Sequence, residues 1–444
     1  MKASPTIAPK EFVRRRADLM AMMEADSIAI LPSSRVMVRN SDIDYPFRQD
    51  SDFRYLSGFA EPDSVLVLVP GRAHGETILF CRERDPDSER WHGQITGPER
   101  AMQILGLDDA FPVADIDDIL PGLIEGKAKL YYAMGTHREF DAQIIAWVDS
   151  IALSQPSGSK PACEFVHLAQ YVHELRLYKS AQEVNVMRHA VSATAAGHLR
   201  LMAELKPGLR EYHLEAELNY AFALAGARTT AYPSIVGSGN NANIMHYTQN
   251  ADVIRSGDLV LVDAGAEYEG YAADVTRTLP ASGRYSAAQA DVYNVVLAAQ
   301  LAAIAEVKPG NHWNQPHEAA VRQITLGLVR LGLLHGEVDE LIRDNAFKKF
   351  YMHRTGHWLG LDVHDVGEYQ IEGEWRVFEP GMVTTIEPGI YIAEDLEDVP
   401  ARYRGIGIRI EDDVLVTKAG CEVITAMIPK TVAAIEQYMA SKVA

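Results

Sequence analysis

The feature that most constrains the fold of this chain is an internal repeat in its second half. Two long helical patterns each end in a Lys-Pro-Gly turn, at 206–208 and 308–310, and each turn leads into a further helix. Farther along, Gly257 begins GDLVLVDAG and Gly381 begins GMVTTIEPG, so an apolar strand ends in an acid in both places. The same order of elements therefore occurs twice, which predicts two similar halves that face each other.

Each copy of the repeat also carries a second acid downstream of the first. Asp263 is followed by Asp274, and Glu387 is followed by Glu411 after the polar insert AEDLEDVPARYRG. A turn near Glu269-Gly270 would fold the first pair into a hairpin, in which the two aspartates are cross-strand neighbours with Cβ atoms about 5 Å apart. Because Asp263 follows LVLV, we expect it to be buried, and a cation is then the simplest neutraliser. An acidic hairpin in water is the alternative.

Three histidines, His353, His357 and His364, lie in the glycine-rich segment MHRTGHWLGLDVHDVG. Imidazole serves both as a metal ligand and as a proton shuttle near neutral pH, so we expect at least two of them to be functional. The sequence of this segment alone does not divide the two tasks among them.

Glu387 and Glu411 each interrupt an apolar run, so we expect burial for both. A buried Glu–Arg pair is the structural alternative, since Arg409 stands two residues before Glu411. Four carboxylates and one imidazole favour Mn²⁺, Fe²⁺, Co²⁺ or Zn²⁺ over Ca²⁺. Two such ions about 3.5–4 Å apart share and activate a bridging water, which predicts a hydrolase. Glu387 would take the proton of that water, and spare histidines would stabilise the oxyanion.

Length and patterning predict an α/β chain of two domains. The 444 residues, of which 47% are hydrophobic, suffice for two or three domains at about 100–200 residues each. In the first part, β-branched runs at IAILP, SVLVLVP, TILFC and KLYYAMG alternate with helix-like stretches. Ser154–Pro161 is the best linker candidate, and Ser180 with Glu183 forms a capping-box pattern at the start of a new helix. We therefore predict a small domain at 1–172 and a second domain at 173–444.

Charge and composition exclude several classes of protein. A net charge of −19 argues against a nucleic-acid or anionic-membrane partner. Three isolated cysteines support neither a disulfide framework nor a thiolate zinc site. The start lacks the apolar stretch of a signal peptide, and we expect no run as long as the ~18–20 apolar residues of a membrane span. A cytoplasmic location fits these features.

The motifs resemble those of aminopeptidase P, the Xaa-Pro aminopeptidases, within the pita-bread metallopeptidases. The resemblance spans nearly the whole chain and includes NSDIDYPFRQDSDFRYLSGFAEPDSVLVL, SIVGSGNNANIMHYT, VDAGAEYEGYAADVTRTLP, HWLGLDVHDVG, EPGMVTTIEPGIYI and RGIGIRIEDD. It implies a curved sheet with pseudo-twofold symmetry in the second domain, and cleavage before a proline in the second position of a peptide. One segment ahead of the ligand histidine, Arg354-Thr355-Gly356, is expected to vary within the family.

The resemblance also assigns roles to residues. It implies two Mn²⁺ ions, with Co²⁺ or Zn²⁺ as other candidates, held by Asp263 as a terminal ligand, Asp274 and Glu411 as bridges, and His357 and Glu387 at the second ion. A metal-bridging hydroxide would then attack the peptide. The remaining implied residues are His246 and His364 at the substrate, His353 and Arg409 in support, and Tyr232, Tyr391 and Trp91 shaping the substrate site.

Several functional alternatives remain beside that assignment. A prolidase, which takes only Xaa-Pro dipeptides, uses the same ligands. A binding module that lost its chemistry would keep the fold but not the ligand set, which is intact here. The resemblance further implies a homodimer or homotetramer, in which the N-terminal domain can reach a neighbouring subunit's active site.

Overall fold

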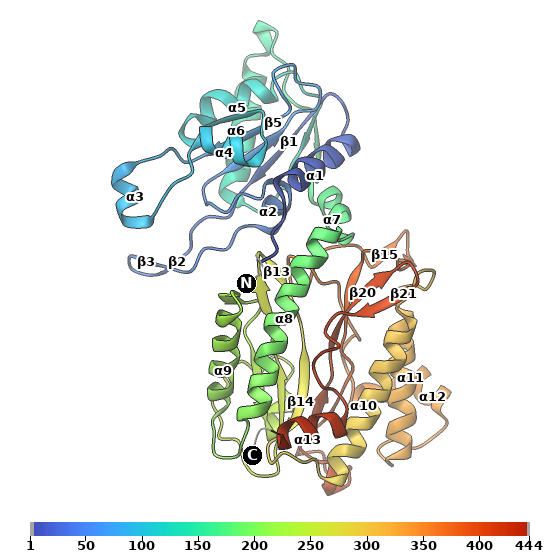
Figure 1. Cartoon of the computed structure of the whole chain (residues 1–444). Helices are drawn as coiled ribbons and strands as arrows, with labels where there is room; N and C mark the ends of the chain where they lie inside the picture. The colour runs from blue at the N-terminus through green and yellow to red at the C-terminus, as the bar shows by residue number, and fades with distance from the viewer. Residues whose placement is uncertain (1–3, 442–444) are drawn as a thin grey trace. The chain divides into compact units, whose positions relative to one another are not determined.

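The computed structural model describes residues 4–441, and contacts divide this part of the chain into two compact units, Thr6–Arg176 and the chain from Leu177 on (Figure 1). The predicted division between 172 and 173 falls inside α7 (Ala169–Leu177), the helix in which this division by contacts also lies. The segment Ser154–Pro161 lies within the first unit, ahead of strand β8 (Glu164–Val166), so its interpretation as an interdomain linker was wrong.

The N-terminal unit is built on one mixed sheet with the strand order β6-β5-β4-β1-β7-β8. All four predicted β-branched runs are strands of this sheet. Strand β4 pairs antiparallel with both β1 and β5. The pairings of β5 with β6, β1 with β7 and β7 with β8 are parallel. Besides β8, the sheet contains β1 (Ser27–Pro32), β4 (Val65–Leu68), β5 (Thr77–Cys81), β6 (Asp109–Pro112) and β7 (Lys129–Tyr131).

Helices complete the core of this unit because their apolar side chains pack against the buried residues of the sheet. Ile144 and Trp147 of one helix belong to the same core cluster as Ile30 and Val67 of the sheet. A hairpin lies outside that sheet. The helices are α1 (Pro9–Met22), α2 (Ser51–Ser57), α3 (Pro86–His92), α4 (Pro98–Leu105), α5 (Ile116–Ile124) and α6 (Arg138–Leu153), and the hairpin pairs β2 (Val38–Asn40) with β3 (Ile43–Asp44).

In the C-terminal unit the predicted repeat is visible in helices and in turns. Helix α8 (Ala181–Glu204) packs on α9 (Glu211–Leu224), and α10 (Ala287–Glu306) packs on α11 (Gln315–Arg330). The capping box of Ser180 and Glu183 is formed as predicted, and Ser286 with Gln289 forms the same device at the start of α10. These caps satisfy backbone N–H groups that have no partner within the helix.

The turn glycines of the two copies also match. Gly208 and Gly310 have φ of 93° and 92°, and Gly257 and Gly381 have φ of 92° and 97°. These angles lie in the region where a side chain is strained, so both copies need glycine at the same points. The repeat is therefore a property of the backbone as well as of the sequence.

The strands of the second unit form small antiparallel groups, in the orders β10-β11-β14, β13-β12-β9 and β17-β20-β21, with β18 paired to β19 and β15 to β16. Their bounds are β9 (Thr229–Thr230), β10 (Ile235–Ser238), β11 (Leu259–Asp263), β12 (Ala266–Tyr268), β13 (Tyr271–Ala272), β14 (Thr276–Pro280), β15 (Gln370–Ile371), β16 (Glu374–Trp375), β17 (Val383–Ile386), β18 (Gly389–Ile392), β19 (Ile406–Arg409), β20 (Asp412–Thr417) and β21 (Gly420–Val423). The remaining helices are α12 (Val338–Arg343) and α13 (Val432–Ala440).

The expectation that no stretch is as long and apolar as a membrane span does not hold for one helix. Among the described residues, α10 alone is long and apolar enough to cross a membrane when judged by length and composition. Its buried residues, including Val292, Tyr293 and Val296, lie in the core of the C-terminal unit. Apolar composition in such a helix follows from packing on several neighbours.

Candidate metal centre

Four of the five predicted ligands, all of them acids, lie at or next to strand ends of the two halves of the repeat. Asp263 is the last residue of β11, and Glu387 follows β17 directly. Asp274 precedes β14, and Glu411 lies between β19 and β20. The fifth residue is His357, in the loop ahead of β15. Strands can place carboxylates at one end with high precision because their own backbones are fixed by the ladders.

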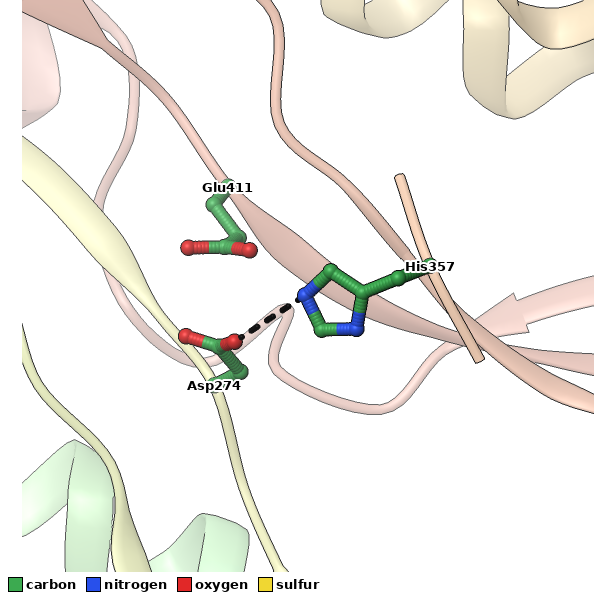
Figure 2. A group of neighbouring side chains, drawn as sticks. All are labelled: Asp274, His357 and Glu411. Carbon is green, nitrogen blue, oxygen red and sulfur yellow. Dashed lines mark ion pairs between the residues drawn. The ribbon is translucent and has the colours of Figure 1, made fainter. Parts of the chain in front are cut away.

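Three of these side chains form a compact group. Asp274, His357 and Glu411 each offer a ligand atom, and these atoms lie within 4.8 Å of one another (Figure 2). His357 Nε2 is 3.4 Å from an Asp274 oxygen and 3.7 Å from an oxygen of Glu387. The structure therefore brings together residues that are up to 137 positions apart, as the facing halves require.

The orientation of His357 suits a metal ligand. Its Nδ1 donates to the carbonyl oxygen of Trp358 at 2.9 Å, so Nε2 carries no hydrogen in the neutral ring and turns a lone pair toward two carboxylates. Lone pairs facing one another require a proton or a metal ion between them. Without metal a proton fills this role, and the hydrogen bond and charges of Asp274 and Glu387 outweigh burial and raise the pKa of His357 to about 9.

The four carboxylates outnumber the positive charges around them. Burial raises the pKa of Glu387 to about 7, and burial with the neighbouring acids holds that of Glu411 well above its usual range. Asp263 has a raised pKa from burial, despite an ion pair at 2.6 Å with Arg409. Three buried acids and Glu387, which is only half-buried, thus face the positive charges of Arg409 and His357. Divalent ions fit this donor set and would supply the missing charge.

The hairpin between the two aspartates forms, but its register differs from the expectation. Asp263 pairs with Thr276, not with Asp274, and the turn falls at Glu269 and Gly270 as predicted. Asp274 still lies close, because the hydroxyl of Tyr232 donates to either acid, with O···O distances of 2.6 Å to Asp263 and 2.5 Å to Asp274. The alternative of an acidic hairpin in water is wrong, since both aspartates are buried.

Two glycines permit the close approach of these segments. A Cβ on Gly265 would lie 1.6 Å from the carbonyl oxygen of Ala273, and one on Gly356 would lie 2.0 Å from that of Thr385. Only glycine therefore allows the strand after Asp263 and the loop before His357 to pack where they do.

Arg409 does not form the pair with Glu411 that the sequence left open. Its guanidinium binds Asp263 and also donates to the hydroxyl of Tyr391 at 3.0 Å, whereas Glu411 accepts from Thr276 Oγ1 at 2.8 Å. Tyr391 in turn contacts His353 Nε2 at 2.8 Å. A series of hydrogen bonds therefore runs from His353 through Tyr391 and Arg409 to Asp263.

A cavity of about 900 Å³ opens beside these acids and is lined, among the described residues, by side chains of the C-terminal unit. The predicted residues His246, His353, His364, Arg409 and Tyr232 all line it. His246 and His364 are exposed, so a ligand in the cavity can reach both. Burial lowers the pKa of His353 to about 4, so that ring is neutral and is held by Tyr391 and by the Arg354 carbonyl.

Two predicted substrate residues lie elsewhere. Tyr391 is 3% exposed and stands behind the lining, where it supports His353 and Arg409. Trp91 lies in α3 of the N-terminal unit and is 84% exposed.

Sequence reasoning missed an aromatic wall of the cavity, made by Trp313, Tyr369 and Trp375. Their rings lie in contact, with centroids 4.3 Å apart for Trp313 and Tyr369 and 5.9 Å apart for the two tryptophans. The sequence signal was faint, because Trp313 precedes a helix, Tyr369 precedes a hairpin and Trp375 is the last residue of that hairpin. Only folding makes them neighbours.

Sequence reasoning also missed a second buried acid next to Glu411. Asp412 accepts from Arg277 and Thr425 at one oxygen and from Gln300 and Lys430 at the other, over 2.7–2.8 Å. We call this group the Asp412 cluster. Burial alone would raise the pKa of Asp412, but the charges of Arg277 and Lys430 outweigh it and hold the pKa far below the usual range.

Known proteins resemble this chain over nearly its whole length. The sequence model of metallopeptidase family M24 matches residues 185–418, and that of the aminopeptidase P N-terminal domain matches residues 12–131. The chain is 43% identical to the Xaa-Pro aminopeptidase of Escherichia coli over 434 residues, which cover 98% of each protein.

Solved structures give the same result. Aminopeptidase PepP of Pseudomonas aeruginosa superposes with a TM-score of 0.97 at 57% identity, over 98% of this chain and 99% of that one. Zinc-substituted aminopeptidase P of Escherichia coli, in complex with product, superposes with a TM-score of 0.96 at 42% identity over the same shares. The predicted fold class, an α/β N-terminal domain followed by the metallopeptidase domain, is confirmed.

Proposed function

Since the chain belongs to metallopeptidase family M24 and is a metallo-hydrolase of the Xaa-Pro aminopeptidase group, we propose that it removes the first residue from peptides with proline in second position by means of two bound divalent ions. The observation that carries this proposal is the convergence of Asp274, His357 and Glu411, with ligand atoms within 4.8 Å. Asp263 and Glu387 adjoin this group through Tyr232 and His357.

The metals would be held by Asp263, Asp274, His357, Glu387 and Glu411. Divalent ions bound there would lower the pKa of an attacking water and polarise the scissile carbonyl. Manganese is our choice from the resemblance, and Co²⁺ or Zn²⁺ suits the same oxygen and nitrogen donors. These donors do not encode proline, so the specificity depends on the cavity wall.

The protein's own residues supply the remaining chemistry. Glu387, which lines the cavity 3.7 Å from His357 Nε2, takes the proton of the attacking water and passes it to the proline nitrogen as the bond breaks. His246 and His364, both exposed in the cavity, donate to the developing oxyanion and to the substrate main chain. The hydrogen bonds that link His353 through Tyr391 and Arg409 to Asp263 fix the orientation of Arg409.

Assembly and location belong to the same proposal. We place the protein in the cytoplasm as a homodimer or homotetramer, without a nucleic-acid or membrane partner, which is consistent with its charge of −19. Trp91 would help to shape the active site of a neighbouring subunit, and its 84% exposure leaves its indole available for that contact.

The test is a comparison of substrates with the metal-free protein loaded in turn with Mn²⁺, Co²⁺ and Zn²⁺. We expect metal-dependent release of the first residue from an Xaa-Pro-Xaa tripeptide, and faster turnover of this tripeptide than of an Xaa-Pro dipeptide. Faster turnover of the dipeptide would identify a prolidase instead. An absence of both bound metal and turnover would leave only a binding module.

A further inference from the structure

Arg354 presents a positive charge in the cavity of the candidate metal centre. It lines that cavity, is exposed, and belongs to the short segment 354–356 in which we expect family members to differ. Its guanidinium carbon lies 5.2 Å from the ring centre of Trp313 and 5.2 Å from that of Trp375. Two indoles therefore hold the group in place without using its N–H donors.

Most of those donors remain open to a ligand. One nitrogen, Nη2, donates to Asn314 Oδ1 at 2.5 Å. Within residues 4–441 Arg354 forms no ion pair with a carboxylate, and the nearby Glu318 instead accepts from the amide of Asn314 at 2.6 Å. A guanidinium has five N–H donors in a planar fork that matches a carboxylate. An unpaired cation in a chain of net charge −19 thus points to an anionic ligand.

The direction in which a peptide lies in the cavity decides which anionic group reaches Arg354. That direction follows from the proposed function. An aminopeptidase has one residue ahead of the scissile bond, so the amino end of the peptide must lie beside the metal ligands. The part of the peptide that extends toward the exposed lining then contains the carboxyl end. Since a residue spans at most about 3.3–3.6 Å and two residues follow the scissile carbonyl, the terminal carboxylate of a tripeptide lies at most about 7 Å beyond it. A cavity of about 900 Å³ has room for a peptide of this size.

We propose that Arg354, held on Trp313 and Trp375, binds the C-terminal carboxylate of short peptides and so makes the enzyme favour Xaa-Pro-Xaa tripeptides with a free carboxyl end. Arg354 is a specificity-determining residue in this assignment, and it takes no part in bond cleavage. The aromatic wall beneath it packs against the apolar part of the same peptide.

The experiment compares kcat/KM of the Mn²⁺-loaded enzyme for one Xaa-Pro-Xaa sequence as the free acid and as the C-terminal amide. Wild type should favour the acid about tenfold, the size of a charge-assisted hydrogen bond that stays partly open to water. Arg354→Met should lower this ratio to about one, mainly through KM, and Arg354→Lys should keep part of it.

Arg402→Met is the matched control. Arg402 is also exposed and stacked, 4.7 Å from the ring centre of Tyr403, but it does not line this cavity. Its variant removes the same charge and should keep the wild-type ratio. A lower ratio in this control would show a nonspecific effect of net charge and would overturn the assignment.

Other outcomes also decide the matter. Equal turnover of acid and amide by wild type would overturn the assignment, as would a loss of both by the same factor in Arg354→Met, because that result indicates a structural role. An amide with aspartate in third position that matches the free acid would show that Arg354 binds an acidic side chain and not the chain terminus. If wild type cleaves none of these peptides, the proposed function itself fails, and the inference falls with it.

Discussion

Glu411 and Asp412 are consecutive acids in two very different regions, the candidate metal centre and the Asp412 cluster. They are 1% and 0% exposed, so burial does not distinguish them. Asp412 accepts hydrogen bonds from two cations and two neutral groups, and its pKa is held far below the usual range. Glu411 accepts from the neutral hydroxyl of Thr276, and burial beside three other acids raises its pKa.

This difference separates a structural charge from a functional one. The Asp412 cluster brings its own counter-ions, so its charge is stable in the folded chain without a ligand. The candidate metal centre has more negative charge than its residues neutralise, which favours a bound cation. The two groups should therefore respond in opposite ways to substitution and to metal.

The largest expected effect is the loss of activity in Glu411→Gln. Removal of a carboxylate ligand should lower kcat/KM about a thousandfold, because metal stabilisation of the transition state amounts to several kcal/mol. The metal-free variant should unfold at the same temperature as metal-free wild type or higher, since one buried uncompensated charge is gone. Tripeptide turnover, metal content and thermal unfolding measure these outcomes, and activity like that of wild type would refute the site assignment.

Asp412→Asn should show the reverse pattern. The substitution leaves the charge of Arg277 buried without its partner, so we expect the free energy of unfolding to fall by about 3–5 kcal/mol. Below its own unfolding transition the variant should keep most of its activity and its metal. Denaturant unfolding with a parallel assay measures both quantities. If activity fell a thousandfold in a folded variant, the two regions would not be separate.

Added metal should distinguish the two variants. Manganese at a hundred times its dissociation constant should stabilise wild type by about 2.7 kcal/mol, since an ion that binds only the folded state shifts unfolding by mass action. Asp412→Asn should gain as much as wild type, whereas Glu411→Gln should gain much less. Thermal scans of metal-free protein with and without Mn²⁺ provide the measurement, and an equal gain in all three proteins would mean that the ion binds elsewhere.

The smallest effect concerns Lys430, the more exposed of the two cations beside Asp412. Its side chain is 20% exposed, against 0% for Arg277. Lys430→Met should lower the free energy of unfolding by about 1 kcal/mol, because Arg277, Gln300 and Thr425 still donate to the acid. Chemical unfolding of this variant, beside that of Asp412→Asn, gives the comparison. A loss as large as that of Asp412→Asn would show that the charge depends chiefly on Lys430.

Much of the fold followed from local sequence patterns. The capping box at Ser180 and the strand runs of the first domain could be predicted because they depend on neighbours in the chain. The register of Asp263 was harder, since Asp274 lies only two residues before Thr276 and the exact turn decides which of the two pairs with Asp263. The linker prediction at Ser154–Pro161 failed because composition does not show whether the next strand joins the preceding sheet.

By itself, the sequence determined the repeat, the candidate ligand residues and the family, because turn glycines, apolar strands and terminal acids are local and repeated features. Only the tertiary structure decided which neighbour of each acid neutralises it. In the run Glu411-Asp412-Asp413, three successive acids look alike, and a partner such as Arg277 lies more than 130 residues away. The same holds for Arg354, whose position over Trp313 and Trp375 depends on segments that meet only when the chain folds.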